Sequence, residues 1–324
     1  MATSPRLRAL REHLLYWLLV IFSAVGRRIP VRAGRIIGRA LGALAYFVVR
    51  REGRKALANL AIAFSEWSED QRRKTLRAMF VHFGKSVMEI AWLPNLDPRS
   101  RDQTTIVEGI DRVLQLIDSG RGVICFTAHC GNWEWLSYVM GSYGRPVYVL
   151  QRGRDHPEMN DYITRLRASA GVRTIDRGSP TSARDMIQAI RKGGMLAFVI
   201  DQNIRTESVK VPFFDKPALT PIGPARFAVR TEAMVVPAVI ERRPDGMQHA
   251  RFLEPIECRK GDDPIALTAR LTRVVEDQIR RAPEQWVWMH DRWRDRPQWD
   301  VSEEVRARGA RRSPPASDET ATEP

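Results

Sequence analysis

The chain has 324 residues, of which 44% are hydrophobic, so it carries enough apolar side chains for one large folded domain or two small ones. Its formal net charge of +14 indicates an anionic partner. The three cysteines, Cys125, Cys130 and Cys258, are odd in number and scattered, which excludes a disulfide framework and fits a reducing compartment.

Residues 1–50 combine apolar runs with many basic side chains. Residues 1–60 contain twelve Arg and Lys against two Glu. The run Leu14–Val25 has twelve residues, fewer than the roughly 20 that a helix needs to cross a bilayer. A glycine and two arginines, in place of a small-residue cleavage site, follow it. We predict that residues 1–50 form a membrane-anchoring arm on an anionic cytoplasmic leaflet.

Two other interpretations of this arm stay open. An ordinary buried amphipathic helix has the same pattern. A nucleic-acid-binding arm is less well supported, because phosphate binding does not require long apolar faces such as Ile36–Val49. We therefore expect an anionic membrane surface as the partner, and no nucleic acid.

Residues 51–300 have the pattern of an α/β domain. Arg54–Leu93 is typical of two or three amphipathic helices, which end before Pro94. Apolar runs then alternate with helical stretches, which predicts a mostly parallel central sheet flanked by helices. The expected strands are Val123–Thr127, Pro146–Leu150, Leu196–Ile200 and Val235–Ile240, and the expected helices are Pro157–Ala170, Ser182–Lys192, Pro224–Thr231 and Pro264–Arg281. Residues 301–324 lack an apolar pattern and are expected to be a disordered tail.

The segment HCGNWE places a histidine and a glutamate, His129 and Glu134, directly after the first expected strand. In a continuous helix the two side chains would lie about 140° apart, so they meet only if His129 precedes the helix. Gly131 permits a tight turn and Asn132 is a suitable N-cap, which supplies that geometry. A histidine held by a carboxylate takes a proton from a hydroxyl at neutral pH. This pair is therefore the candidate catalytic site, with Glu134 expected to fix the imidazole tautomer.

Several further segments, taken in order with HCGNWE, resemble the lipid A biosynthesis acyltransferases, which are lauroyl and myristoyl transferases of the lysophospholipid acyltransferase superfamily. HCGNWE alone identifies only the superfamily, and the ordered set is the specific signal. The resemblance covers roughly Arg54–Pro297, and its segments are RKALANLAIAFSEWSEDQRR, HCGNWE, QRGRDHPEMNDYITRLR, AFVIDQN, VPFFDKPALTPIGPARFA and APEQWVWMHDRWRDRP.

The resemblance implies a role for five residues. His129 matches the catalytic histidine and Glu134 its acidic partner. Arg152, Arg165 and Asp201 match residues expected at the substrate: the two arginines would bind phosphate, carrier or developing oxyanion charge. The resemblance implies a glycerol-phosphate-acyltransferase-like fold, in which residues 51–300 are the catalytic domain.

The implied reaction transfers a fatty acyl chain from acyl carrier protein to a hydroxyl of a lipid A precursor of the Kdo2-lipid A type, on the cytoplasmic face of the bacterial inner membrane. No cofactor and no metal are expected, since the acyl donor is carried on the phosphopantetheine of the carrier protein. Three alternatives stay open: another phosphoglycolipid or lysophospholipid acceptor, as in the phosphatidylinositol mannoside acyltransferases; acyl-CoA as donor; and a non-catalytic membrane-binding protein with the same fold.

Overall fold

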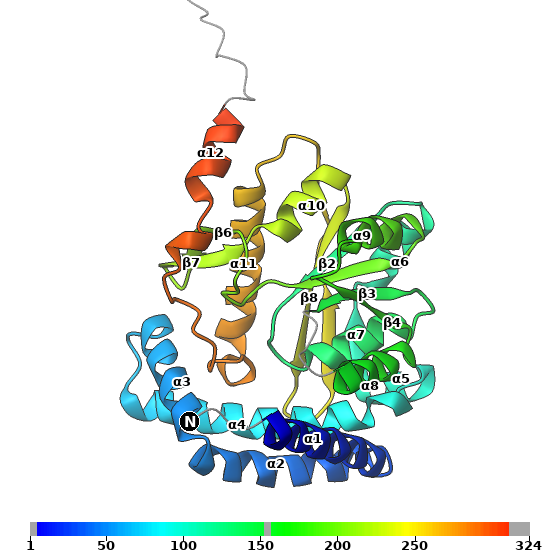
Figure 1. Ribbon diagram of the computed structural model, residues 1–324, viewed down its shortest axis with the longest axis vertical. Coiled ribbons are helices and arrows are strands. Elements are labelled where there is room, and N and C mark those ends of the chain that lie inside the picture. The colour runs from blue at the N-terminus through cyan, green and yellow to red at the C-terminus, as the bar shows by residue number, and fades with distance from the viewer. Residues whose placement is uncertain (1–4, 152–156, 311–324) are drawn as a thin grey trace, which may run out of the picture.

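The computed structural model describes residues 5–151 and 157–310, and within them one eight-stranded sheet forms the centre of the protein (Figure 1). The strand order is β1-β9-β8-β2-β5-β3-β4, with β10 beside β8. Neighbouring strands run parallel, except where β8 meets β9 and β10. The prediction of a mostly parallel α/β sheet is therefore confirmed. The strands are β1 Thr105–Glu108, β2 Val123–Thr127, β3 Val147–Gln151, β4 Val172–Asp176, β5 Met195–Val199, β8 Met234–Arg242, β9 Gln248–Phe252 and β10 Ile256–Glu257.

Strand β2 lies in the middle of the sheet and all five of its residues are buried. Ile124 and Phe126 belong to a hydrophobic cluster that includes α9, α10 and α11, whereas Val123 and Cys125 belong to a second cluster that includes α6 and α7. Burial on both faces explains why β2 reads as a continuous apolar run. The helices named here are α6 Ile110–Asp118, α7 Trp133–Gly141, α9 Ser182–Arg191, α10 Gly223–Thr231 and α11 Pro264–Arg281.

The four expected strands and the four expected helices between Pro157 and Arg281 are present with their ends shifted by two residues or fewer, and α8 is Pro157–Ala168. Strand β10, which has only two residues, was not predicted, and neither were strands β1, β4 and β9. Their sequences TIVE, VRTID and QHARF are short and partly polar, and β1 and β4 lie at the two edges of the sheet. A separate antiparallel hairpin pairs β6 Ser208–Phe213 with β7 Lys216–Pro221.

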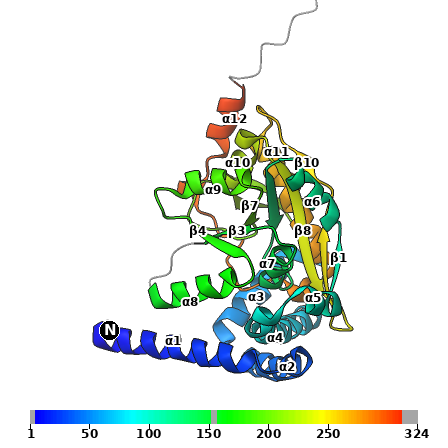
Figure 2. The ribbon, with the colours of Figure 1, turned by 90° about the vertical axis from the view of Figure 1, so that its right-hand side faces the viewer.

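Helices α1, α2 and α4 lie together at one end of the protein, and α1 extends from the body beneath α8 (Figures 1 and 2). Of the helices that the structure describes, none is both long enough and apolar enough to cross a membrane. Ser68 caps α4 by accepting a hydrogen bond from the Gln71 N–H at 3.3 Å. The helices of this part are α1 Pro5–Gly26, α2 Val31–Val48, α3 Arg50–Ala63, α4 Glu69–Trp92 and α5 Pro98–Thr104, with a short 3-10 turn at Leu93–Asn95.

Helices α2 and α4 touch backbone to backbone through glycines. A Cβ added at Gly38 would lie 2.4 Å from the carbonyl oxygen of Gly84, and one added at Gly84 would lie 2.0 Å from the carbonyl oxygen of Gly38. Residues 31–48, which belong to the predicted membrane-anchoring arm, are therefore packed against the folded body on their glycine face.

Replacing Gly84 with alanine is expected to lower the free energy of unfolding by about 1–3 kcal/mol, because the new methyl group forces the two helices apart. Gly53→Ala is the matched control: it also lies in a helix, but its added Cβ meets no atom closer than Leu76 Cδ2 at 3.8 Å. Urea unfolding of both variants checks the prediction, and equal stability of Gly84→Ala and the parent would contradict it.

The expected disordered tail begins with a helix, α12, at Ser302–Ala310, so the prediction is wrong for these residues, and residues 311–324 lie outside the described part. The Ser302 N–H donates to Asp300 Oδ1 at 3.0 Å, which satisfies a donor at the start of the helix. Val305 packs with Val209 and Val211 of β6. A single buried valine supplies this contact, which explains why no apolar pattern predicted it. Two 3-10 turns, Pro283–Gln285 and Pro297–Trp299, precede α12.

Candidate active site

His129 lies in the turn between β2 and α7, at the carboxyl end of the central strand. Gly131 has a φ of +67°, and a Cβ there would lie 2.1 Å from the carbonyl oxygen of Ile240, so this turn requires glycine. Asn132 Oδ1 accepts a hydrogen bond from the Trp135 N–H at 3.2 Å and caps α7. The tight turn and the N-cap predicted from HCGNWE are therefore confirmed.

A C-terminal segment holds this turn from the other side. The His129 carbonyl oxygen accepts a hydrogen bond from the Val287 N–H at 3.2 Å, and the Gly131 N–H donates to the Gln285 carbonyl at 2.9 Å. Trp286, between them, is fully buried. The EQW segment of the C-terminal motif is thus part of the site's support.

The carboxylate that contacts the His129 imidazole belongs to Asp201. Asp201 Oδ1 lies 2.9 Å from His129 Nδ1, and its Oδ2 accepts from the His129 N–H at 3.1 Å and from Trp286 Nε1 at 2.7 Å. Asp201 follows β5, which pairs directly with β2, so the two carboxyl ends meet. Because a carboxylate only accepts hydrogen bonds, Nδ1 carries the proton and Nε2 keeps a lone pair.

The two side chains hold each other in their charged forms. Burial by itself lowers the pKa of His129, but the charge of Asp201, its hydrogen bond and the charge of Glu134 raise that pKa above its ordinary value. Burial by itself raises the pKa of Asp201, but the charge of His129 and hydrogen bonds from His129 and Trp286 bring it below its ordinary value. The arrangement therefore favours an imidazolium once a proton has been taken.

Glu134 does not make the contact that the sequence pattern predicted for it. Its carboxylate forms a two-pronged ion pair with Arg167 of α8: Arg167 Nε donates to Oε2 at 3.0 Å, and Nη2 donates to Oε1. Arg167 Nη1 also donates to Gln151 Oε1 at 2.7 Å. The planar guanidinium fits both carboxylate oxygens, which directs Glu134 away from the ring and leaves the tautomer to Asp201.

The two arginines that were predicted, Arg165 and Arg152, have different outcomes. Arg165 is exposed on α8, and two residues along a helix correspond to about 200° of rotation, so Arg167 presents its guanidinium on the opposite side. Arg152 lies outside the described residues. Arg167 was missed, although it stands in the same TRLR segment as Arg165.

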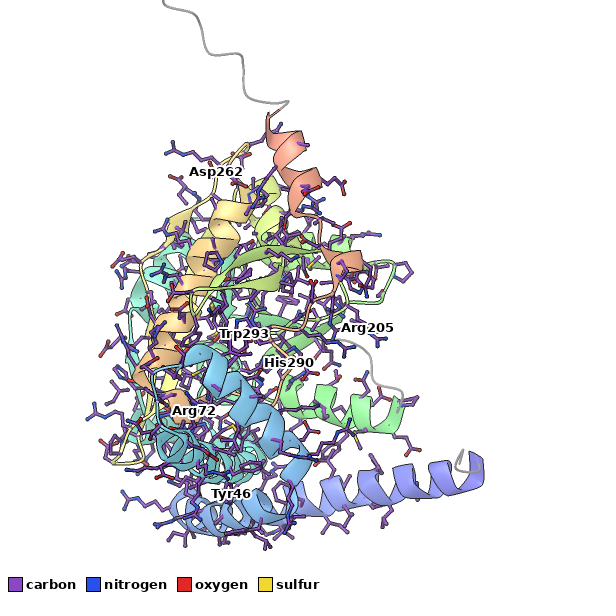
Figure 3. All side chains as sticks on the ribbon, turned by 90° about the vertical axis from the view of Figure 1, so that its left-hand side faces the viewer. Tyr46, Arg72, Arg205, Asp262, His290 and Trp293 are labelled. Carbon is purple, nitrogen blue, oxygen red and sulfur yellow. The ribbon has the colours of Figure 1, made fainter. Side chains whose placement is uncertain are left out.

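A cavity of about 830 Å³ opens beside His129 at the carboxyl edge of the sheet. His129, Glu134 and Arg167 line it together. One part of the wall is apolar and comprises Leu136, Met140, Val149, Leu150, Phe198 and Phe227. Another part is basic and comprises Arg177, Arg205, Arg226, Arg230 and Arg296. Figure 3 shows Arg205 on the side of the molecule that carries α8, with His290 further inside. The cavity thus combines a base with room for an apolar chain and an anionic group.

Neither metal binding nor nucleophilic catalysis by a cysteine finds support at this site. Within residues 5–151 and 157–310, no group of three or more His, Cys, Asp or Glu side chains is placed to hold a metal ion. Cys130 is buried, and burial followed by the charge of Asp201 raises the pKa of its thiol well above the ordinary value. A thiol kept protonated is a poor nucleophile, which fits a packing role for Cys130.

Comparison with known proteins places this site in a family. Residues 1–295 match the family described as bacterial lipid A biosynthesis acyltransferase. The lipid A biosynthesis lauroyltransferase of Escherichia coli (strain K12) is 29% identical over 92% of this chain and 98% of its own. The palmitoleoyltransferase of the same organism is 28% identical over 90% and 97%. A phosphatidylinositol mannoside acyltransferase of Mycobacterium tuberculosis is 26% identical over 69% and 71%. The family match begins at residue 1, so it extends the predicted resemblance over the N-terminal helices, and the chain belongs to the bacterial lipid A biosynthesis acyltransferases.

Proposed function

We propose that this acyltransferase moves a fatty acyl chain from the thioester of an acyl carrier protein to a hydroxyl of a lipid A precursor of the Kdo2-lipid A type, with His129 as the general base. The observation that carries the proposal is the His129–Asp201 pair, whose imidazole lines a cavity with both an apolar wall and a basic wall. The reaction needs these parts: a proton acceptor, space for the acyl chain, and cations for phosphate.

The steps follow from the tautomer. His129 Nε2 takes the proton of the acceptor hydroxyl, and the oxygen attacks the thioester carbonyl carbon to form a tetrahedral intermediate. The carbon–sulfur bond then breaks, an ester remains on the lipid, and the thiolate takes the proton from the imidazolium. Asp201 keeps the proton on Nδ1 and stabilises the imidazolium. General-base catalysis by His129 contributes about 10²- to 10⁴-fold in rate.

The basic wall supports anionic substrates. Within the described part of the chain, Arg177, Arg205 and Arg296 make no ion pair, so their charges are available to a ligand. Arg226 pairs with Glu207. A guanidinium fork suits phosphate oxygens, which both the carrier's phosphopantetheine and a lipid A precursor possess. The predicted anion-binding role of Arg165 has no support from the cavity, which it does not line.

A second acceptor class has its own support. One relative is named a phosphatidylinositol mannoside acyltransferase, and it is 26% identical over 69% of this chain. Lipid extraction after expression in a lipid A-producing host that lacks one secondary acyl chain separates the two. A restored acyl chain on lipid A supports the main proposal, whereas an unchanged lipid A profile overturns it and leaves the phosphoglycolipid acceptor. Replacing the carrier-bound donor with acyl-CoA in the purified assay tests the donor.

We also propose that the protein works on the anionic cytoplasmic face of the bacterial inner membrane. Helices α1 and α2 expose large apolar side chains, among them Leu18 at 53%, Ile21 at 56% and Ile36 at 72%. Arginines such as Arg28 and Arg39 are also exposed on this end of the molecule. An exposed apolar face with basic flanks suits a helix pair lying in the interface.

The double variant Leu18→Glu, Ile21→Glu is expected to weaken binding to vesicles that contain anionic phospholipid at least tenfold, because each leucine or isoleucine buried contributes roughly 1.5–3 kcal/mol. Lys260→Glu is the matched control, because it lowers the net charge by the same amount. Lys260 precedes Asp262 by two residues, and Asp262 lies at the opposite end of the molecule from Tyr46 of α2 (Figure 3). Vesicle sedimentation measures both, and equal losses would show that net charge alone drives binding.

A further inference from the structure

A buried charged cluster lies beneath the catalytic turn. Glu89 of α4 is 1% exposed, and it accepts hydrogen bonds from Arg35 Nε at 2.6 Å, Arg242 Nε at 2.9 Å and Gln248 Nε2 at 3.0 Å. Burial alone raises the pKa of Glu89, but Arg242 and then Arg35 lower it to about 2, so the carboxylate stays charged. The cluster joins α2, α4, β8 and β9.

This cluster reaches the turn through Asn132. Asn132 is 1% exposed, its Nδ2 donates to Glu89 Oε2 at 2.9 Å, and its Oδ1 caps α7. Both functional ends of the Asn132 amide are thus used, one for the helix and one for the cluster. Asn132 stands between His129 and Glu134, so fixing its side chain fixes the backbone that carries both.

Arg242 holds the same turn by a second route. Its Nη1 lies 2.7 Å from His82 Nδ1, and its backbone N–H and carbonyl both bond to the Gln285 side chain, at 2.8 and 2.9 Å. The Gln285 carbonyl in turn accepts from the Gly131 N–H at 2.9 Å. Burial, and then Arg242, lower the pKa of His82 to about 3, which keeps its ring neutral and its Nδ1 an acceptor.

We infer that Glu89 and Arg242 are positioning residues of the acyl-transfer reaction, which act on His129 through Asn132 and the Gln285 contact. Removing a carboxylate and two arginines from water costs free energy that offsets much of their mutual attraction. The cluster is therefore poorly explained by stability alone. A catalytic turn, by contrast, gains directly, because a displacement of about 1 Å from the productive geometry costs on the order of 10²-fold in rate. This inference rests on the proposed function.

The test uses the N-cap exchange Asn132→Ser, measured in the full-length protein with a thioester donor and a lipid A precursor. Serine keeps the cap on α7 but cannot donate to Glu89 from the same position. We expect kcat to fall about 10- to 100-fold while both KM values stay within about threefold. Ser68→Asn, which exchanges the same two residue types at the cap of α4, is the control and should retain the parent kcat.

Glu89→Gln separates positioning from stability. In the parent protein, Glu89→Gln should lower kcat. If Glu89 acts through Asn132, the same change made in the Asn132→Ser variant should lower kcat much less. Independent losses that multiply, or a parent-like kcat for Asn132→Ser, would overturn the inference while leaving the proposed function intact. An inactive parent chain in the same assay would instead overturn the proposed function. Asn132→Ser alone decides the case should Glu89→Gln fail to fold.

Discussion

Replacing His129 with alanine is expected to lower kcat for acyl transfer by about 10²- to 10⁴-fold, because the acceptor hydroxyl loses the group that takes its proton. The KM values for donor and acceptor should change little, since the imidazole is one small part of a cavity of about 830 Å³. Product formation followed by mass spectrometry over time measures both constants.

His249→Ala is the matched control for this variant. His249 lies on β9 and pairs with Glu108 and Glu241, and it does not line the cavity. Its replacement should leave kcat unchanged. An active His129→Ala protein would mean that the proton leaves the hydroxyl by another route, and the assignment of the base would fall.

Replacing Asp201 with asparagine is expected to have an effect of similar size, about 10²- to 10⁴-fold in kcat. If the amide of the substituted asparagine donates an N–H to Nδ1 of His129, the ring proton moves to Nε2. A protonated Nε2 has no lone pair to take the proton of the acceptor hydroxyl. The pH profile should change as well. Among the groups that raise the pKa of His129, Asp201 has the largest effect. Removing the Asp201 charge should therefore lower the pKa of His129. A base works only when neutral, and the acid limb of kcat/KM should therefore move to lower pH.

Asp215→Asn is the control for this exchange. Asp215 is exposed in the β6–β7 turn with a φ of +57°, a conformation that asparagine also adopts readily. Comparing the pH dependence of kcat/KM for the two variants checks the prediction. A fall in kcat without any shift of the acid limb would assign Asp201 to folding and not to the imidazole.

The central strands could be predicted because burial on both faces leaves a signal in consecutive residues. Val123–Thr127 was predicted with its observed ends for this reason. The edge strand β4, VRTID, is buried at only two of five positions, so its sequence resembles a loop. The turn at Gly131 and Asn132 was also predictable, since it depends on local chemistry.

The partner of the imidazole could not be predicted from spacing. Asp201 is 72 residues from His129, and they meet because β2 and β5 are neighbours in the sheet. Strand order is a property of the whole fold, whereas Glu134 was preferred for its closeness in sequence. Asp201 itself was named through the family resemblance, but as a substrate-binding residue, and Arg167 was missed because nothing local distinguishes it from Arg165.

The most direct test of the central claim is mass spectrometry of a tetra-acylated lipid A precursor after incubation with the purified protein and a defined acyl carrier protein thioester. We predict a product heavier by one ester-linked acyl chain, formed by the parent chain and lost with His129→Ala. An unmodified precursor with the parent protein, in the presence of a thioester that a known lipid A acyltransferase consumes, would contradict the account.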